Sequence, residues 1–156
     1  MKLRLYHHHD GARVAYREAG TGPPLVLLHS AFFSHREWEP LVAELSDRFR
    51  LILPDLPLHG DSEDRPIHAY SPEWLAEVVA GFCRETGGAR PIVGGHEAGA
   101  QLLLRAVAGH GLTPSRLVLM SSSLHRSPVD ARLAWAVRAA ARVAAVPGLD
   151  RAVARG

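Results

Sequence analysis

Short apolar runs and amphipathic segments alternate along the chain. The apolar runs in "PLVLLHS", "FRLILPD", "RPIVGG" and "SRLVLM" are continuous, which is typical of strands buried on both faces of a sheet. Between them, three segments carry apolar side chains at helical spacing: residues 35–46, the stretch that begins at Ser71, and residues 98–109. This alternation predicts an α/β fold with a mostly parallel sheet flanked by helices.

Two further strand-like segments precede these runs and bring the expected number of strands to about six. "KLRLYHHH" and "ARVAYREAG" flank Asp10-Gly11, a dipeptide typical of hairpin turns, so we expect an antiparallel hairpin. On a strand His7 and His9 share one face, which makes a metal pair conceivable. No carboxylate or cysteine cluster accompanies them in the sequence, so we expect solvated histidines and no metal site.

Helix boundaries are also marked in the sequence. Ser71-Pro72-Glu73 has the residues of a helix start, with serine as the N-cap, proline at the first helical position and an acid in the first turn. The last stretch, residues 129–156, is rich in alanine and arginine and is helical in pattern up to Pro147-Gly148.

Composition narrows the class of protein. The 156 residues suit one domain, with 47% hydrophobic and 22% charged residues and a formal net charge of +2. The arginines are scattered, so we expect no nucleic-acid partner. Cys83 is the single cysteine, which favours a reducing compartment and a buried structural thiol. Without a membrane-length apolar run, a signal-peptide pattern or a cofactor motif, we expect a cytoplasmic protein with no cofactor.

The chemistry of an α/β sheet is expected beyond the carboxyl ends of its strands. At one of these ends, "GGHEAG" has the form G-x-nucleophile-x-G, with Glu97 at the centre of a sharp turn from strand to helix. Small residues on both sides let the strand and helix backbones approach each other. We expect a positive φ at Glu97, which costs an L-residue about 1–2 kcal/mol, and a carboxylate that reaches the N–H of Ala98 or Ala31.

Four motifs in order resemble the N-terminal half of an α/β-hydrolase, from about residue 3 to residue 125. "DGARVAYREAGTGPPLVLLHS" is similar to the family's opening hairpin and third strand, and "HSAFFSHREWEPLVAEL" resembles its oxyanion loop and first helix. "LILPDLPLHGDS" resembles the segment after the next strand, and "VGGHEAGAQ" resembles the nucleophile elbow. Ser30 and Leu58 stand where the family usually has glycine.

The resemblance implies a role for several residues. Glu97 takes the nucleophile position, and the backbone N–H groups of Ala31 and Ala98 map onto the oxyanion hole. His29 is expected to brace the oxyanion loop, and Asp55 resembles the structural aspartate that ties the following loop together. The implied partner is a small-molecule substrate.

Two departures from the family change the expected chemistry. The elbow usually carries serine, or aspartate in the dehalogenase and epoxide-hydrolase branches. A glutamate there suits attack on an alkyl halide or an epoxide better than attack on an ester. The family's acid and histidine follow the sixth strand, where this chain looks helical, and His125 is the only local substitute for the histidine as general base. We therefore divide the chain into a core at residues 1–125 and a lid-like helical segment at residues 126–156.

Three hypotheses from different classes remain open. In the first, the chain is a divergent hydrolase that acts on a small apolar ester, halide or epoxide. In the second, it is a catalytically silent relative that binds a ligand or partner. In the third, it is one half of a split or truncated hydrolase, and its sheet ends before the last strands. Residues 117–120 would then form an open apolar sheet edge, so we expect a homodimer or pairing with a complementary C-terminal fragment.

Overall fold

The computed structural model describes residues 1–63 and 70–121, all within the compact unit Met1–Leu124. In chain order the elements are β1 (Lys2–His7), β2 (Arg13–Ala19), β3 (Pro24–Leu28), the 3-10 helix η1 (His35–Trp38), α1 (Glu39–Leu45), β4 (Arg50–Pro54), α2 (Pro72–Gly87), β5 (Ile92–His96), α3 (Ala98–Gly109) and β6 (Arg116–Met120). His125 and the expected helical segment 126–156 lie outside the described residues, so the predicted division of the chain stays a prediction.

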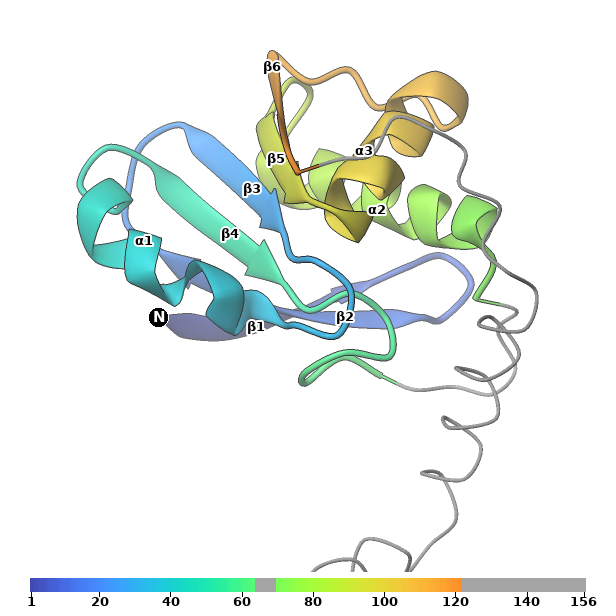
Figure 1. The fold of residues 1–156 in the computed structure, drawn as a ribbon, viewed down its shortest axis with the longest axis horizontal. Helices are drawn as coiled ribbons and strands as arrows, with labels where there is room; N and C mark the ends of the chain where they lie inside the picture. The colour runs from blue at the N-terminus through green and yellow to red at the C-terminus, as the bar shows by residue number, and fades with distance from the viewer. Residues whose placement is uncertain (64–69, 122–156) are drawn as a thin grey trace, which may run out of the picture. The chain divides into compact units, whose positions relative to one another are not determined.

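Six strands form one mixed sheet in the order β1-β2-β4-β3-β5-β6 (Figure 1). β1 and β2 form an antiparallel hairpin, β2 is also antiparallel to β4, and β4, β3, β5 and β6 run parallel. This confirms the predicted hairpin followed by a parallel sheet. The hairpin turn is wider than the Asp10-Gly11 pair, because pairing stops at His7 and Arg13 and the chain between them forms the turn.

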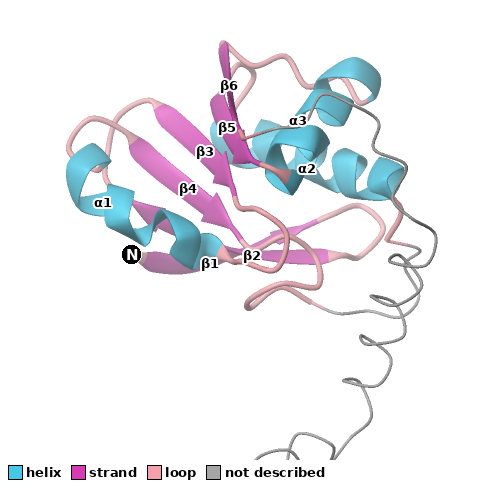
Figure 2. Cartoon of the chain, viewed as in Figure 1, coloured by secondary structure: helices cyan, strands magenta, loops and turns pink. Residues whose placement is uncertain are grey.

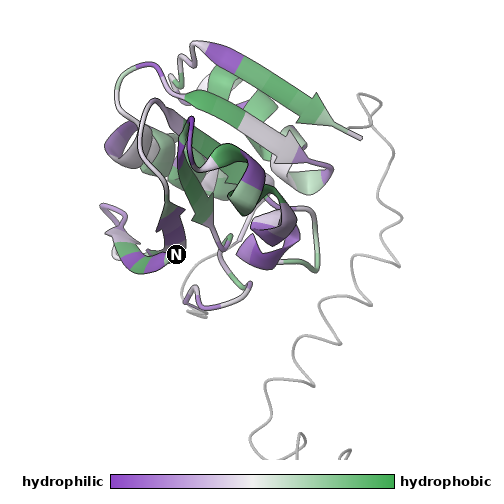
Figure 3. Cartoon of the chain, turned by 90° about the vertical axis from the view of Figure 1, so that its left-hand side faces the viewer, coloured by the Kyte–Doolittle hydropathy of each residue, from purple (hydrophilic) through white to green (hydrophobic). Residues whose placement is uncertain are grey.

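Helices cover both faces of the sheet (Figure 2). On one face, α2 and α3 pack on alternate strand residues such as Val26, Leu28 and Ile52. On the other face, Trp38 of η1 packs on the intervening residues, including Leu27. Because successive side chains of a strand point to opposite faces, a strand with helices on both sides must be apolar at every position. Figure 3 accordingly shows several of the strands largely in green, whereas the strand next to the N-terminus also carries purple.

Helix starts follow local chemistry. The Ser71 side chain accepts a hydrogen bond from the Trp74 N–H at 3.1 Å and caps α2, which confirms the sequence prediction. The single helix expected over 35–46 is wrong in detail, since η1 and α1 are separate pieces. Pro40 explains the division, because it has no N–H to donate to the carbonyl four residues earlier and sits in the first turn of α1.

The side of the sheet that holds α2 also buries Cys83 completely. Burial raises the pKa of its thiol to about 12, so the side chain stays protonated and apolar, as predicted for a structural cysteine. None of the helices in the described part of the chain combines the length and the apolar character that crossing a bilayer requires.

Candidate active site

Glu97 forms the apex of the turn between β5 and α3. Its backbone has φ 43° and ψ −105°, which confirms the predicted positive φ. The turn is fixed on both sides, because the Glu97 N–H donates to the Met120 carbonyl at 3.0 Å and the Glu97 carbonyl accepts from the Gln101 N–H at 3.0 Å. The side chain itself is exposed, so its carboxylate faces solvent at the carboxyl edge of the sheet.

Glycines on both sides of Glu97 allow the turn. A Cβ on Gly95 would lie 2.6 Å from the Ala100 nitrogen, and a Cβ on Gly99 would lie 2.6 Å from the Leu28 carbonyl oxygen. These neighbours are backbone atoms, so no side-chain rotation could relieve the contacts. The close approach places the first turn of α3 against the end of β3, and it thereby brings the two segments that carry Ala31 and Ala98 to the same edge.

The N–H groups of Ala31 and Ala98 are the expected oxyanion-hole donors. Ala98 is the first residue of α3, and the first N–H groups of a helix have no acceptor within it. Within residues 1–63 and 70–121, no hydrogen bond uses either N–H. The expectation that the Glu97 carboxylate reaches them is wrong for this structure, because the Glu97 side chain makes no capping bond to α3 and no bond to Ala31. Neither N–H is therefore engaged by another residue of the part of the chain that the structure describes.

His29 braces the loop that follows β3. Its Nε2 accepts from the Leu56 N–H at 2.9 Å, so the ring proton sits on Nδ1, which donates to the Ser30 carbonyl at 2.7 Å. Burial lowers the pKa of His29 and favours this neutral form, although its bond to Ser30 works in the opposite direction. With both nitrogens in use, His29 holds the loops after β3 and β4 together, as the sequence predicted.

His59 supports the same loop from the other side. Its Nε2 accepts from the Phe32 N–H at 3.4 Å and its Nδ1 donates to the Pro57 carbonyl at 3.0 Å. Phe32 and Leu58 both have positive φ values, 68° and 71°, and both side chains are exposed. Together with the exposed Phe33, they give the two loops at this edge an apolar surface next to Ala31.

Asp55 ties the loop after β4 together without facing solvent. Its Oδ1 accepts from the His35 backbone N–H at 2.7 Å and contacts the His35 ring Nδ1 at 2.8 Å, and its Oδ2 accepts from the Asp61 N–H at 2.9 Å. Burial acts to raise the pKa of Asp55, but these hydrogen bonds outweigh it and hold the pKa below its usual value. Asp55 is therefore an ionised structural carboxylate, in agreement with the resemblance.

One pair of residues at this edge had no signal in the sequence. The Glu37 Oε1 lies 2.5 Å from the His96 Nδ1, and the Glu37 Oε2 accepts from the Ser30 N–H at 2.7 Å. Burial acts to raise the pKa of Glu37, but the bonds from His96 and Ser30 lower it below its ordinary value. The carboxylate thus links the oxyanion loop to the residue before Glu97. No local pattern reveals this, because Glu37 and His96 are 59 positions apart.

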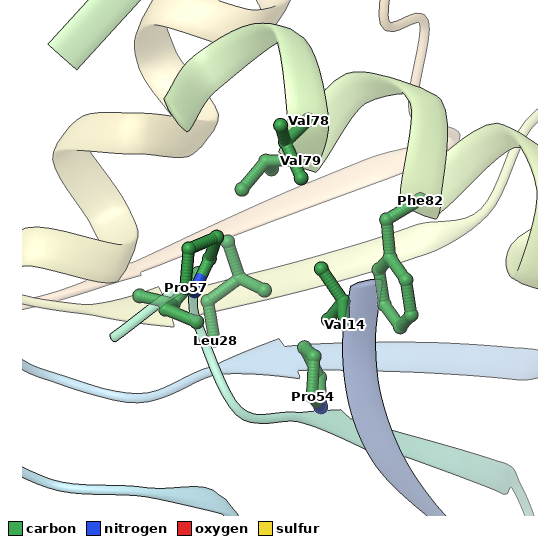
Figure 4. Close-up of a pocket in the computed structure, with 8 residues that line it drawn as sticks. Val14, Leu28, Pro54, Pro57, Val78, Val79 and Phe82 are labelled. Atoms are coloured by element: carbon green, nitrogen blue, oxygen red, sulfur yellow. The ribbon is translucent and has the colours of Figure 1, made fainter. Parts of the chain in front are cut away.

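A small apolar cavity lies between the sheet and α2 (Figure 4). It is lined by Val14, Leu28, Pro54, Leu56, Pro57, Val78, Val79 and Phe82. Its volume of about 10 Å³ is far below the roughly 300–1,000 Å³ of ligand pockets, so it is a packing defect and not a substrate site.

Comparisons with known proteins agree with this geometry. A soluble epoxide hydrolase of Corynebacterium sp. (strain C12) is 34% identical over 105 residues, which are 65% of this chain and 36% of that protein. An α/β hydrolase fold protein from Burkholderia ambifaria superposes with a TM-score of 0.72 at 30% identity, over 81% of this chain and 46% of that one. An N-acyl homoserine lactonase complexed with N-butanoyl homoserine superposes with a TM-score of 0.69 at 27% identity, over 78% and 45% of the two chains.

The chain spans about a third of the length of the curated relatives it matches. The model of the alpha/beta hydrolase family matches residues 25–155, which is most of the chain and includes the elbow and both loops described above. This protein therefore belongs to the alpha/beta hydrolase family.

Proposed function

We propose that Glu97 is a carboxylate nucleophile that attacks the sp³ carbon of a small apolar epoxide or alkyl halide. The observation that carries the proposal is an exposed carboxylate on a strained elbow, at the edge that also holds the N–H groups of Ala31 and Ala98. The exposed Phe32, Phe33 and Leu58 favour an apolar substrate. The likeness to a soluble epoxide hydrolase supports the same substrate class.

The proposed step forms an alkyl ester on the enzyme. A Glu97 carboxylate oxygen bonds to the substrate carbon. The carbon–halogen bond breaks and releases halide, or the carbon–oxygen bond of the epoxide breaks and the resulting alkoxide takes a proton from water. An ester substrate is less suitable, because attack by a carboxylate on its carbonyl gives an unstable anhydride. We therefore expect negligible esterase activity.

Release of the product requires a base that activates water, and the described histidines near Glu97 have other tasks. His29 and His59 use both ring nitrogens, and His35 contacts the buried Asp55. His96 is paired with Glu37. His125, the candidate base of the sequence analysis, lies outside the described residues. We propose that each chain forms the alkyl ester and then hydrolyses it slowly. If His125 is the base, the rate of hydrolysis should fall further in His125→Ala.

Intact-mass measurement tests this proposal. The chain is incubated with styrene oxide or with a benzylic bromide, and a single adduct of the expected mass should form and map to Glu97. Glu97→Gln should abolish it. Glu44→Gln is the matched control, because Glu44 is an exposed acid on α1, and it should leave the adduct unchanged.

Three outcomes would contradict the proposal. Equal labelling of the wild type and Glu97→Gln would mean that the reagent alkylates the surface without selection. No adduct at all would favour the catalytically silent relative. Turnover of a short activated ester well above background, lost in Glu97→Ala, would show acyl transfer instead.

A partner at the sheet edge is the second part of the proposal. β6 pairs with β5 on one side, and within the described residues no strand pairs with its other side. Val118 is 47% exposed there, and an open apolar edge is a template for another strand. We propose that a second copy or a complementary hydrolase segment pairs with β6.

Sedimentation across a concentration series tests the edge. The mass should rise above 17.0 kDa with concentration, and Val118→Lys should shift it back toward the monomer because lysine blocks edge pairing. If only a complementary segment binds, the chain alone stays monomeric and the amides of residues 117–120 exchange fast. A monomer with slow exchange at these amides would overturn the proposal.

A further inference from the structure

The turn of the β1–β2 hairpin lies beside α2 (Figure 1), and three side chains with metal-ligand chemistry come together there. His8 and His9 belong to the turn and Glu77 to the second turn of α2, and one potential ligand atom from each lies within 4.8 Å of the others. The His9 Nε2 is already 3.2 Å from a Glu77 carboxylate oxygen. We propose that His8, His9 and Glu77 form a site for a divalent transition-metal ion of the zinc type, which joins the hairpin to α2.

The turn explains why these histidines meet. On a continuous strand, His8 and His9 would point to opposite faces. β1 ends at His7, however, and the chain turns at once, so the rings of His8 and His9 come to 4.2 Å between centroids. In the sequence, the alternation of a strand indicates His7 and His9 as the conceivable metal-binding pair, and no carboxylate cluster lies near them. Glu77 is distant in the sequence and is supplied by the fold.

The distances suit a zinc site that closes by small side-chain movements. Zinc binds imidazole nitrogen and carboxylate oxygen at roughly 2.0–2.2 Å, which puts two tetrahedral ligands about 3.3 Å apart. The His9–Glu77 separation of 3.2 Å fits this spacing, and the widest separation must shorten by roughly 1–1.5 Å. His9 and Glu77 can supply that movement, since their side chains are 68% and 43% exposed, whereas His8 is buried and serves as the fixed ligand.

Tyr6 orients the buried ligand. Its hydroxyl lies 2.9 Å from the His8 Nδ1, and a ligating imidazole commonly donates its other N–H to an oxygen of this kind. Gly81 provides the space, because a Cβ there would lie 2.4 Å from the Tyr6 hydroxyl and 3.2 Å from the His8 Nδ1.

The site is distinct from the elbow. In the strand order, β1 is separated from β5 by four interstrand steps, or about 19 Å at the usual strand spacing. A metal ion at His8 would therefore not contact a substrate at Glu97. Its expected effect is to stabilise the hairpin against α2, where Asp10 already accepts from the Trp74 indole N–H at 2.7 Å.

Titration calorimetry of the full chain with Zn²⁺ tests the proposal after removal of metals by a chelator. We expect one equivalent to bind, and His9→Ala and Glu77→Gln each to weaken binding at least 10-fold. Both side chains are exposed, so these variants should fold. His7→Ala is the matched control and should bind as the wild type does, because His7 lies on β1 outside the cluster. Cobalt(II) in place of zinc should give the visible absorption of a four-coordinate site.

A flexible run of three histidines makes the opposite prediction. In that case His7→Ala would weaken binding as much as His9→Ala, and Glu77→Gln would change nothing; either this pattern or no binding at all would overturn the proposal. Thermal unfolding gives a second readout. A free zinc concentration about 100 times Kd should raise Tm by about 5–10 °C in the wild type and in His7→Ala. Glu77→Gln should lose most of this shift at the same concentration.

Discussion

Replacing Glu97 by glycine is expected to give a more stable protein than replacing it by alanine. The backbone at residue 97 has φ 43° and ψ −105°, a conformation in which a Cβ is strained whatever side chain it carries. Such conformations cost about 1–3 kcal/mol. Glycine removes this strain, but it also destabilises the folded state by about 0.5–1 kcal/mol, because the unfolded chain has more conformational entropy with glycine than with alanine. The free energy of unfolding of Glu97→Gly should thus exceed that of Glu97→Ala by about 1 kcal/mol, and by about 2.5 kcal/mol at most.

Urea denaturation followed by circular dichroism measures this difference. The same pair of substitutions at Glu44 provides the control, because Glu44 lies on α1, where glycine is about 1 kcal/mol less favourable than alanine. The order of the glycine and alanine variants should therefore reverse between the two sites. If Glu97→Gly is no more stable than Glu97→Ala, the elbow stores no strain and the reasoning fails.

Two further predictions concern the residues that hold this edge together. Gly99→Ala places a Cβ 2.6 Å from the Leu28 carbonyl oxygen and should lower the free energy of unfolding by about 2–3 kcal/mol. Gly109→Ala is the control and should not destabilise the protein, because a Cβ at Gly109 meets no atom within 4 Å. Urea denaturation of both variants measures the difference. The folded-state pKa of Asp55 is depressed, so its stabilising contribution is present above the unfolded pKa of about 3.9 and is lost as pH falls through the folded value. Asp55→Asn should cost roughly 1.5–3 kcal/mol at pH 7 and reduce the acid dependence of the urea midpoint measured between about pH 3 and 7; an unchanged pH profile would contradict the assignment.

Sequence patterns predicted those parts of the structure that are determined by interactions between residues close together in the chain. The strands follow from continuous apolar runs, and the start of α2 follows from Ser71, whose side chain bonds to an N–H three residues later. The strained turn at Glu97 follows from Gly95 and Gly99, because only residues without a Cβ fit against the backbone atoms there. These signals operate within one element or one turn, so a single sequence contains them.

Interactions between distant segments could not be predicted in the same way. Glu37 lies on a segment whose helical pattern gives no reason to expect a bond to His96. The contact between His9 and Glu77 likewise depends on where β1 ends, and the strand pattern alone placed that end beyond the histidines. Both pairs exist because the sheet order brings their elements together, and that order is a property of the whole fold.

The geometry of the elbow and the chemistry of residue 97 are separable. Gly95 and Gly99 impose the turn through contacts with backbone atoms, and these contacts do not depend on the side chain at position 97. A glutamate there is not required by the fold, and it retains a strain that glycine would remove. It stands at the N-cap of α3, where the helix dipole favours negative charge, although its carboxylate makes no bond to the Ala98 N–H. A Glu97→Gly variant that folds more stably than Glu97→Ala, and yet no longer reacts with an epoxide, would assign the carboxylate to chemistry and the turn to the scaffold.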